Sequence, residues 1–526
     1  MTIKNIFKAV AVILGFSAIL KVIGFFLRVI LSRELGAEVL GYYQVALSFY
    51  GVLCTIIGSG IPVTISHFSA RSSVSGDYES EGSAVTSSII IELFVCAILT
   101  VLCFAFNGVI AKFTSKVSAN ILLLLLPAVY SGAIYACFRG ALWGRKKHFD
   151  NCISEVGEQS VRLILFLIFF SFTSPSEKAG YYAAICNSAS CFVSMGISIF
   201  FYFKHGGRLK SPKKEFKQVF KTSSAITCVR VISSLAQPLI AVLLPLRLIS
   251  AGFSAEQAMS LFGVALGMTM PLLALPNSII GSYATALIPE LSTSLAAKNT
   301  KEFNEQVQTA ITLSLLICFC FLPIFLGVGE QIGILLFNNT TSGYLLKLTS
   351  WTIIPIGLCG ITHSILNVLG LETRGFIHQV LGSVVLLLAI LFLPKYVGIS
   401  SLAYGVGGCM TITTILNCLL IYKKTNINGL VLKPFALMTI FCIPSSLLSK
   451  WLFGVLKYIM TPFFSVCFSA GFGLLMFLVL CVLFGVINVS ALFVKLKNVK
   501  INKHKHKKVL KKHKKLIFPS FLFKNK

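Results

Sequence analysis

Apolar runs of about twenty residues recur along almost the whole chain, and they restrict its fold more than any other feature. A helix of this length spans the hydrocarbon layer of a membrane and bonds all its own backbone N–H and C=O groups there. Hydrophobic residues make up 56% of the 526 residues and charged residues 12%, against about 25% charged in a soluble domain. The runs lack the alternation of a β-barrel. The sequence therefore predicts an all-α polytopic membrane protein.

We expect about fourteen transmembrane helices joined by short loops. Lys4 and Lys8 precede apolar residues as in a signal peptide, but Lys21 and Arg28 interrupt the run, so we interpret it as an uncleaved first span. The expected spans are 6–31, 41–66, 84–110, 120–141, 153–173, 180–203, 222–249, 258–288, 307–329, 345–369, 376–394, 399–422, 433–454 and 463–488.

The distribution of Lys and Arg predicts the orientation. With the N-terminus in the cytoplasm, the basic loops 142–152 and 204–221 and the Lys-rich tail all fall on the cytoplasmic side. The net charge is +29, and residues 495–526 contain 13 Lys and no acidic residue. Because this tail follows a membrane helix directly, we expect it to contact anionic lipid headgroups and not nucleic acid. Both termini are expected to be cytoplasmic, in a multi-pass protein of a bacterial cell membrane.

Weak internal similarity divides the chain into two halves. Ala37-Glu38 and Val45-Ala46-Leu47 recur in the same order about 220 residues later as Ala255-Glu256 and Val264-Ala265-Leu266. An even number of spans per repeat keeps both halves in one orientation, which predicts two six-helix bundles in parallel repeat plus two extra C-terminal helices. The expected parts are a first bundle, a basic linker, a second bundle, two additional helices and a Lys-rich tail, at 1–203, 204–221, 222–424, 425–490 and 491–526.

Two cations lie inside the first apolar run. Lys21 and Arg28 are two helical turns apart and so share one face. A charge at membrane depth costs about 3 kcal/mol on insertion scales, and such residues usually face a polar cavity or a partner. The alternative is that they extend to the membrane interface, which we prefer for Arg33 and Arg247. For Lys21 and Arg28 we favour the wall of a wet, positively charged cavity.

The seventh predicted span repeats this pattern. Thr227, Arg230, Ser234 and Gln237 fall on one helical face, and Pro238 then breaks or kinks the helix. We therefore predict that Arg230 and this face form the second wall of the cavity, with Lys21, Arg28 and Arg230 binding a phosphate group of the substrate.

Further polar residues are assigned to the same cavity or to ion pairs. Gln44 and Ser48 lie on one face of the second span and are assigned to the cavity; the alternative is that this face packs closely against another helix. Asn277 lies beside Pro276 in a proline-rich span and is also assigned to the cavity. Glu158 and Arg162 are spaced for a structural ion pair. Glu92 has no nearby partner in the sequence and is the candidate for proton or sodium coupling.

The sequence gives little support to an enzyme. Its two Asp, Asp77 and Asp150, lie in predicted cytoplasmic loops, which does not fit the paired carboxylates of a metal-dependent glycosyltransferase, and it has no nucleophile elbow, P-loop or HExxH motif. The 16 Cys are scattered without metal-ligand spacing, so we expect no metal site and no disulfide framework. We also expect no cofactor.

Several stretches together resemble the stage V sporulation protein B-like polysaccharide exporters of the multidrug/oligosaccharidyl-lipid/polysaccharide (MOP) superfamily. They include RVILSRELGAEVLGYYQ (28–44), GIPVTIS (60–66), FRGALWGRKKHFDNCISEVGEQSVR (138–162) and the proline-rich segment 236–292. The resemblance implies two bundles around a central cavity, alternating access and flipping of lipid-linked saccharides. The related lipid II flippases have basic residues on either side of a Gly-Phe in the first helix, and Lys21 and Arg28 are similarly placed around Gly24-Phe25.

One departure concerns the substrate. The lipid II flippases also carry an Arg near the middle of the second helix, where this chain has Leu53-Cys54-Thr55. The prediction is therefore a monomeric flippase that exports a lipid-linked oligosaccharide or another polysaccharide precursor, without a commitment to lipid II. Two alternatives remain open: a multidrug cation antiporter of the same superfamily, and a non-transporting membrane scaffold for envelope or spore-coat synthesis.

Overall fold

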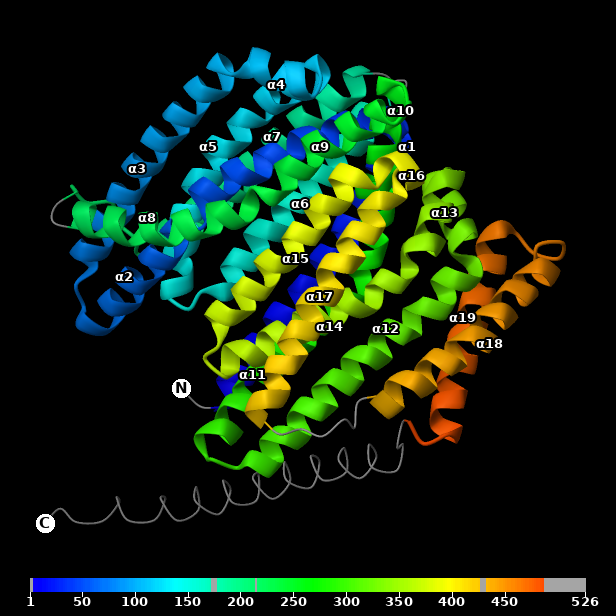
Figure 1. Ribbon diagram of the computed structural model, residues 1–526. Coiled ribbons are helices and arrows are strands. Elements are labelled where there is room, and N and C mark those ends of the chain that lie inside the picture. The colour runs from blue at the N-terminus through cyan, green and yellow to red at the C-terminus, as the bar shows by residue number, and fades with distance from the viewer. Residues whose placement is uncertain (1–2, 172–176, 213–214, 426–431, 487–526) are drawn as a thin grey trace, which may run out of the picture.

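The structure is a computed structural model that describes residues 3–171, 177–212, 215–425 and 432–486, and every regular element in these ranges is a helix (Figure 1). The predicted tail at 491–526 and parts of the predicted segments 204–221 and 425–490 lie outside the described residues. The elements are α1 (Ile3–Gly58), α2 (Ile61–Ser75), α3 (Tyr78–Ala105), α4 (Asn107–Phe113), α5 (Lys116–Gly144), α6 (His148–Phe170), α7 (Glu177–Lys204), α8 (Glu215–Ser234), α9 (Ala236–Ser250), α10 (Ala255–Gly263), the π-helical turn η1 (Val264–Thr269), α11 (Met270–Ala296), α12 (Thr300–Phe337), α13 (Thr340–Thr349), the 3₁₀ turn η2 (Ser350–Thr352), α14 (Ile353–Val368), α15 (Glu372–Phe392), α16 (Pro394–Val397), α17 (Ser400–Thr425), α18 (Leu432–Leu456) and α19 (Pro462–Leu483).

Twelve stretches of helix in the described residues are long and apolar enough to cross a membrane, which confirms the prediction of a polytopic helical membrane protein. One of them, Gly15–Ser75, has 61 residues, which make about 90 Å of helix and suffice for two crossings of a layer about 30 Å thick. Helix α6 is not among the twelve, because charged residues interrupt its apolar surface. A second crossing by Gly15–Ser75 and one by α6 would bring the twelve to about the fourteen that the sequence predicts.

The break predicted between the first two spans is confirmed. The sequence predicted separate helices over 6–31 and 41–66, and α1 (Ile3–Gly58) consists of two helical stretches that meet at a kink between these ranges. The chain changes direction inside α1 at Gly36, whose φ of 71° and ψ of 172° lie outside the helical region. Only glycine adopts this conformation without a steric penalty. A second bend at Ser59-Gly60 separates α1 from α2.

The first bundle is built around α5, which contacts α1, α2, α3 and α7. Gly140 and Gly144 let α5 approach α2 closely, since a Cβ at these positions would lie 2.7 Å and 2.5 Å from the backbone oxygens of Pro62 and Ser66. At the end of α5, Arg145 forms a two-point ion pair with Glu81 of α3, with Nε–Oε1 and Nη2–Oε2 distances of 2.7 Å and 2.9 Å. The Glu81 side chain is fully buried, so this pair fastens α3 to α5 at low dielectric.

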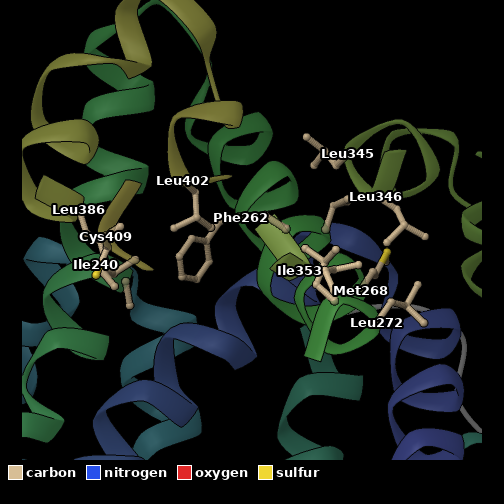
Figure 2. Close-up of a cluster of buried hydrophobic side chains, with 14 of the residues drawn as sticks. Ile240, Phe262, Met268, Leu272, Leu345, Leu346, Ile353, Leu386, Leu402 and Cys409 are labelled. Carbon is tan, nitrogen blue, oxygen red and sulfur yellow. The ribbon is translucent and has the colours of Figure 1, made fainter. Parts of the chain in front are cut away.

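We call α9 to α17 the second bundle, and their buried apolar side chains belong to a continuous cluster that also includes residues of α1, α5 and α7. Figure 2 shows how side chains from separate helices meet there. The labelled residues are Ile240, Phe262, Met268, Leu272, Leu345, Leu346, Ile353, Leu386, Leu402 and Cys409. Helices α18 and α19 pack against each other and against α12, on the side of this bundle away from the first (Figure 1).

The predicted seventh span consists of two helices. It breaks at Leu235, where α8 ends and α9 begins, in agreement with the break expected near Pro238. Proline has no N–H to continue the helix ladder, which weakens the helix one turn earlier. Helix α8 packs on α1, α2 and α3, and α9 packs on α1, α10, α15 and α16. The assignment of the span to the second bundle stays a prediction.

The bundles meet closely where α1 crosses α10, next to the bend at Gly36. A Cβ on Gly41 would lie 2.1 Å from the backbone oxygen of Met259, and a Cβ on Gly263 would lie 2.1 Å from that of Ala37. The two backbones can approach this far only because both residues are glycine. We call this contact the glycine crossing.

Candidate functional site

Lys21 lies on the N-terminal half of α1 and is exposed. Its Nζ donates to the backbone oxygen of Ser278 at 3.0 Å and to Oγ of Ser282 at 3.5 Å, both on α11. Lys21 therefore connects α1 to the second bundle through neutral oxygen atoms. Its ammonium group has no carboxylate partner among the described residues.

Arg28 follows two turns later on the same face of α1, and its side chain is exposed. Within the described residues its guanidinium forms no hydrogen bond or ion pair. An unpaired arginine in an apolar helix is costly unless water or an anionic ligand reaches it. The assignment of Arg28 to a cationic cavity stays a prediction.

Arg230 lies on α8, and its Nη1 donates to the backbone oxygen of Ser59 at 3.3 Å. Thr227, one turn earlier, contacts the same residue through the two hydroxyl oxygens at 3.4 Å. The small residues at the bend make this approach feasible, since a Cβ on Gly60 would lie 2.2 Å from the backbone oxygen of Ser223. Arg230 is therefore anchored to the first bundle.

The three predicted phosphate ligands do not contact one another in this conformation. Lys21 reaches α11 and Arg230 reaches the end of α1, so the two cations are tied to different bundles. Arg230 lies on α8, which packs on α1, α2 and α3.

The other predicted cavity residues have mixed environments. The Oγ atoms of Ser48 and Ser234 donate to carbonyls of their own helices, those of Val45 and Val231. Gln44 and Asn277 are half-buried, and Gln237 is exposed. None of these side chains is buried, and their assignment to a cavity stays a prediction.

Glu158 and Arg162 form the ion pair that their spacing predicts. Arg162 also donates from Nε to Oγ of Ser190 at 2.9 Å, which links α6 to α7. This second bond supports the structural role assigned to the pair.

Glu92 has a different environment on α3. Its side chain is 2% exposed, and its Oε2 has no hydrogen-bond partner among the described residues. A buried carboxyl oxygen without a partner is costly, and such groups often have a functional role.

The sequence analysis did not single out Arg139, whose guanidinium stacks on Tyr135 and Trp143 at 5.3 Å and 4.9 Å from the ring centroids. Its Nε is buried and has no hydrogen-bond partner among the described residues. The spacing of four residues on either side of Arg139 was the signal that could have revealed this arrangement.

Arg33 has a specific partner that the sequence analysis did not identify. Its Nε donates to the backbone oxygen of Leu336 at 2.6 Å and its Nη2 to that of Leu335. It therefore joins α1 to the last turn of α12. This partner lies about 300 residues away in the chain, and no local pattern indicates it.

Solved structures define the class of fold. The chain matches a structure of the lipid II flippase MurJ in its inward closed conformation with a TM-score of 0.67 at 14% identity, covering 90% of this chain and 98% of that one. It matches an inward-facing MATE family multidrug resistance transporter of the MOP superfamily with a TM-score of 0.65 at 14% identity, covering 79% and 98%. The TM-score for an outward-facing MATE structure is 0.55, at 16% identity and 80% and 94% coverage. The protein has the MOP superfamily fold.

The chain belongs to the polysaccharide biosynthesis protein family, which matches residues 6–295 and thus more than half of its length. A relative in Bacillus subtilis (strain 168), stage V sporulation protein B, is 24% identical over 454 residues, which cover 83% of this chain and 87% of the relative. The family resemblance inferred from the sequence is confirmed.

Proposed function

We propose that the protein is a flippase that moves a lipid-linked oligosaccharide or another polysaccharide precursor across the bacterial cytoplasmic membrane. The observation that carries the proposal is the cationic face of α1, where Lys21 and Arg28 are exposed and have no carboxylate partner among the described residues. A lipid-linked saccharide carries a phosphate or diphosphate, which forms charge-assisted hydrogen bonds with lysine and arginine.

In this mechanism Lys21 and Arg28 bind the phosphate, and Arg230 joins them as the bundles move. The sugar occupies the wet space between the bundles, while the prenyl tail stays in the lipid. The higher TM-score with an inward-facing than with an outward-facing MATE structure supports an inward-facing assignment for the present conformation. The glycine crossing then lies at the outer end of the cavity, and alternating access requires it to open.

The proposed setting is a cell membrane with both chain termini in the cytoplasm, as the basic loops predict. The Lys-rich tail contacts anionic headgroups there, and one chain provides both bundles, so a monomer suffices. No cofactor takes part in this mechanism.

The decisive experiment reconstitutes the purified chain in liposomes with a fluorescent lipid-linked saccharide and measures its exposure on each leaflet. We expect flipping by the wild type and a loss of about tenfold or more in Arg28→Ala and in Arg230→Ala, since one charge-assisted contact contributes about 1.5–3 kcal/mol. Arg247→Ala, an exposed arginine at the end of α9, serves as the matched control. Wild-type rates in both Arg28→Ala and Arg230→Ala, with protein that is folded and inserted, would refute the cationic site.

The same liposomes test the two alternatives. Uptake of a lipophilic cation without saccharide flipping would identify a multidrug antiporter. An absence of both activities, with any lipid-linked saccharide, would favour a scaffold. Labelling of Arg28→Cys by a water-soluble maleimide is a simpler check, and complete protection in every condition would indicate packing or interfacial placement of position 28.

A further inference from the structure

Two arginines near the end of α5 have opposite environments. Arg145 is paired with Glu81 of α3, whereas Arg139 forms no hydrogen bond or ion pair with a described residue. Arg139 lies little more than one helical turn before Gly144, the last residue of α5. A charge at this depth is costly unless water or a ligand reaches it, and such residues often mark a binding site. Arg139 is therefore a candidate for contact with the cargo.

Two aromatic rings hold the guanidinium of Arg139 in place. Tyr135 and Trp143 lie one turn before and one turn after it, and its Cζ atom is 5.3 Å and 4.9 Å from the centroids of their rings. A guanidinium that stacks on aromatic rings keeps its N–H donors in its own plane, at its edge. Because the rings fix this orientation in advance, a ligand loses less of its binding free energy to ordering the side chain.

The free edge of this guanidinium can bind a planar anion. Nε is buried without a hydrogen-bond partner among the described residues, and the two Nη atoms have no partner there either. The Arg139 side chain as a whole is half-buried, so its Nη atoms are the part that a ligand can reach. Two N–H groups along one edge of a guanidinium bind the two oxygens of a carboxylate at once. Arg139 thus presents a preformed site for one carboxylate.

Two carboxylates of α6 lie in the same region but are already bonded. The hydroxyl group of Tyr135 donates to Oε1 of Glu155 at 3.2 Å, and Glu158 pairs with Arg162. Both carboxylates act electrostatically on Tyr135, as does Arg139. The two acids offset the charges of Arg139 and Arg162, so the region accommodates a ligand with one negative charge better than a diphosphate, which carries more.

We propose that Arg139 binds a carboxylate on the saccharide part of the cargo, so that the exported saccharide is acidic. This inference rests on the proposed function, in which Lys21 and Arg28 bind the phosphate and leave Arg139 for a second acidic group of the same molecule. The loop 142–152 that follows α5 is predicted to be cytoplasmic, which places Arg139 near the entrance of an inward-facing cavity.

The contrasting interpretation is that Arg139 only braces α5 by stacking on its two rings. Under that interpretation a sugar acid has no effect that depends on Arg139, and a substitution of Arg139 affects acidic and neutral cargo alike. A carboxylate site instead distinguishes an acidic sugar from a neutral sugar of the same shape.

The first test uses the fluorescence of Trp143 in the full chain, in nanodiscs of neutral lipid. The chain has three tryptophans, so Trp351→Phe and Trp451→Phe leave Trp143 as the sole reporter. Sodium glucuronate is titrated against sodium chloride of equal ionic strength, and glucuronamide serves as the uncharged sugar of the same shape. We expect a saturable change with glucuronate and none with glucuronamide.

Variants of this reporter chain connect the signal to Arg139. In Arg139→Gln the half-saturating concentration of glucuronate should rise by about tenfold or more, because one charge-assisted contact is lost. Arg139→Lys keeps the charge but not the two-point geometry, so it should give a smaller rise. Arg247→Gln, which changes an exposed arginine on α9, is the control and should behave as the reporter chain.

Two kinds of result would overturn the inference. No saturable response to glucuronate in the reporter chain, or an equal response in Arg139→Gln, would overturn the site. An equal response to glucuronamide or to inorganic phosphate would overturn the assignment to a carboxylate.

The second test separates this inference from the proposed function. Liposomes contain a lipid-linked saccharide that bears a uronic acid, or its carboxyl-reduced neutral counterpart. Arg139→Gln should lower the ratio of acidic to neutral flipping rates by about tenfold or more, and an unchanged ratio would overturn the inference. If the wild type flips neither lipid but glucuronate still binds through Arg139, the proposed function fails while the carboxylate site stands. Flipping by the wild type without any response to glucuronate would have the opposite meaning.

Discussion

Substitution of Gly41 by alanine tests whether the glycine crossing is a contact that opens during transport. The added Cβ would lie 2.1 Å from the backbone oxygen of Met259, whereas ordinary van der Waals contact begins at 3.4 Å. Neither backbone has a flexible side chain at this point that could move aside. The helices α1 and α10 therefore have to separate by about 1.3 Å, which is a large displacement for an interior packed at crystal-like density.

Overpacking of this kind costs about 1–3 kcal/mol in the state that contains the contact. If the crossing opens in a second state, the alanine is harmless there, and the ratio of open to closed molecules rises by about 5–150-fold. We expect faster hydrogen exchange in peptides covering 33–45 and 255–267, together with a changed flipping rate. Gly24→Ala and Gly51→Ala provide matched controls on the same helix, since nothing lies within 4 Å of a Cβ at either position.

The reasoning would be refuted by a simple result. If Gly41→Ala lowers the midpoint of thermal unfolding while exchange near the crossing stays at the level of Gly24→Ala, the contact is static packing within one state. The same conclusion would follow if Gly41→Ala left both the exchange and the flipping rate unchanged.

Two further predictions concern the first bundle. Glu81→Gln should destabilise the protein by about 3–5 kcal/mol, because it leaves the guanidinium of Arg145 largely buried without its charge partner. The control is Glu79→Gln, which removes an exposed ion pair with Lys210 that contributes about 0–1 kcal/mol. Equal unfolding midpoints for the two variants would contradict the stabilising role of the Glu81–Arg145 pair. Glu92→Gln should fold normally and make flipping in liposomes insensitive to an imposed proton or sodium gradient, if this carboxyl group couples transport to an ion. A gradient response equal to that of the wild type would remove Glu92 from the mechanism.

The helical class and the approximate number of crossings could be predicted from the sequence, because bilayer thickness sets the length of each apolar run. The bend at Gly36 falls in the gap that the sequence predicted between its first two spans. The close packing of α1 on α10 beside this bend was not predicted, because it depends on Gly41 and Gly263, which lie far apart in the chain. The break near Pro238 was predictable because it has a local covalent cause.

The candidate site was predictable only as a set of residue types. Helical spacing placed Lys21 and Arg28 on one face, and the structure finds both exposed. The hydrogen-bond partners of Lys21 and Arg33 could not be predicted, because Lys21 contacts Ser278, which is 257 residues away, and Arg33 contacts α12, which is about 300 residues away. Arg230 is a further example, because its partner Ser59 lies 171 residues away in the chain.

The contacts within the first bundle differ in kind from those between the bundles. Inside it, Glu81 pairs with Arg145 and Glu158 pairs with Arg162, and breaking such a buried pair leaves an uncompensated charge. Between the bundles, the specific contacts include the glycine crossing and the bonds from Lys21 and Arg33 to neutral backbone oxygens. Water or a phosphate can replace those oxygens at small cost, and the glycines have no side chains to disengage. This contrast favours movement of the two bundles as rigid bodies. In such a movement, α1 would break its contacts with α10, α11 and α12 and form new ones.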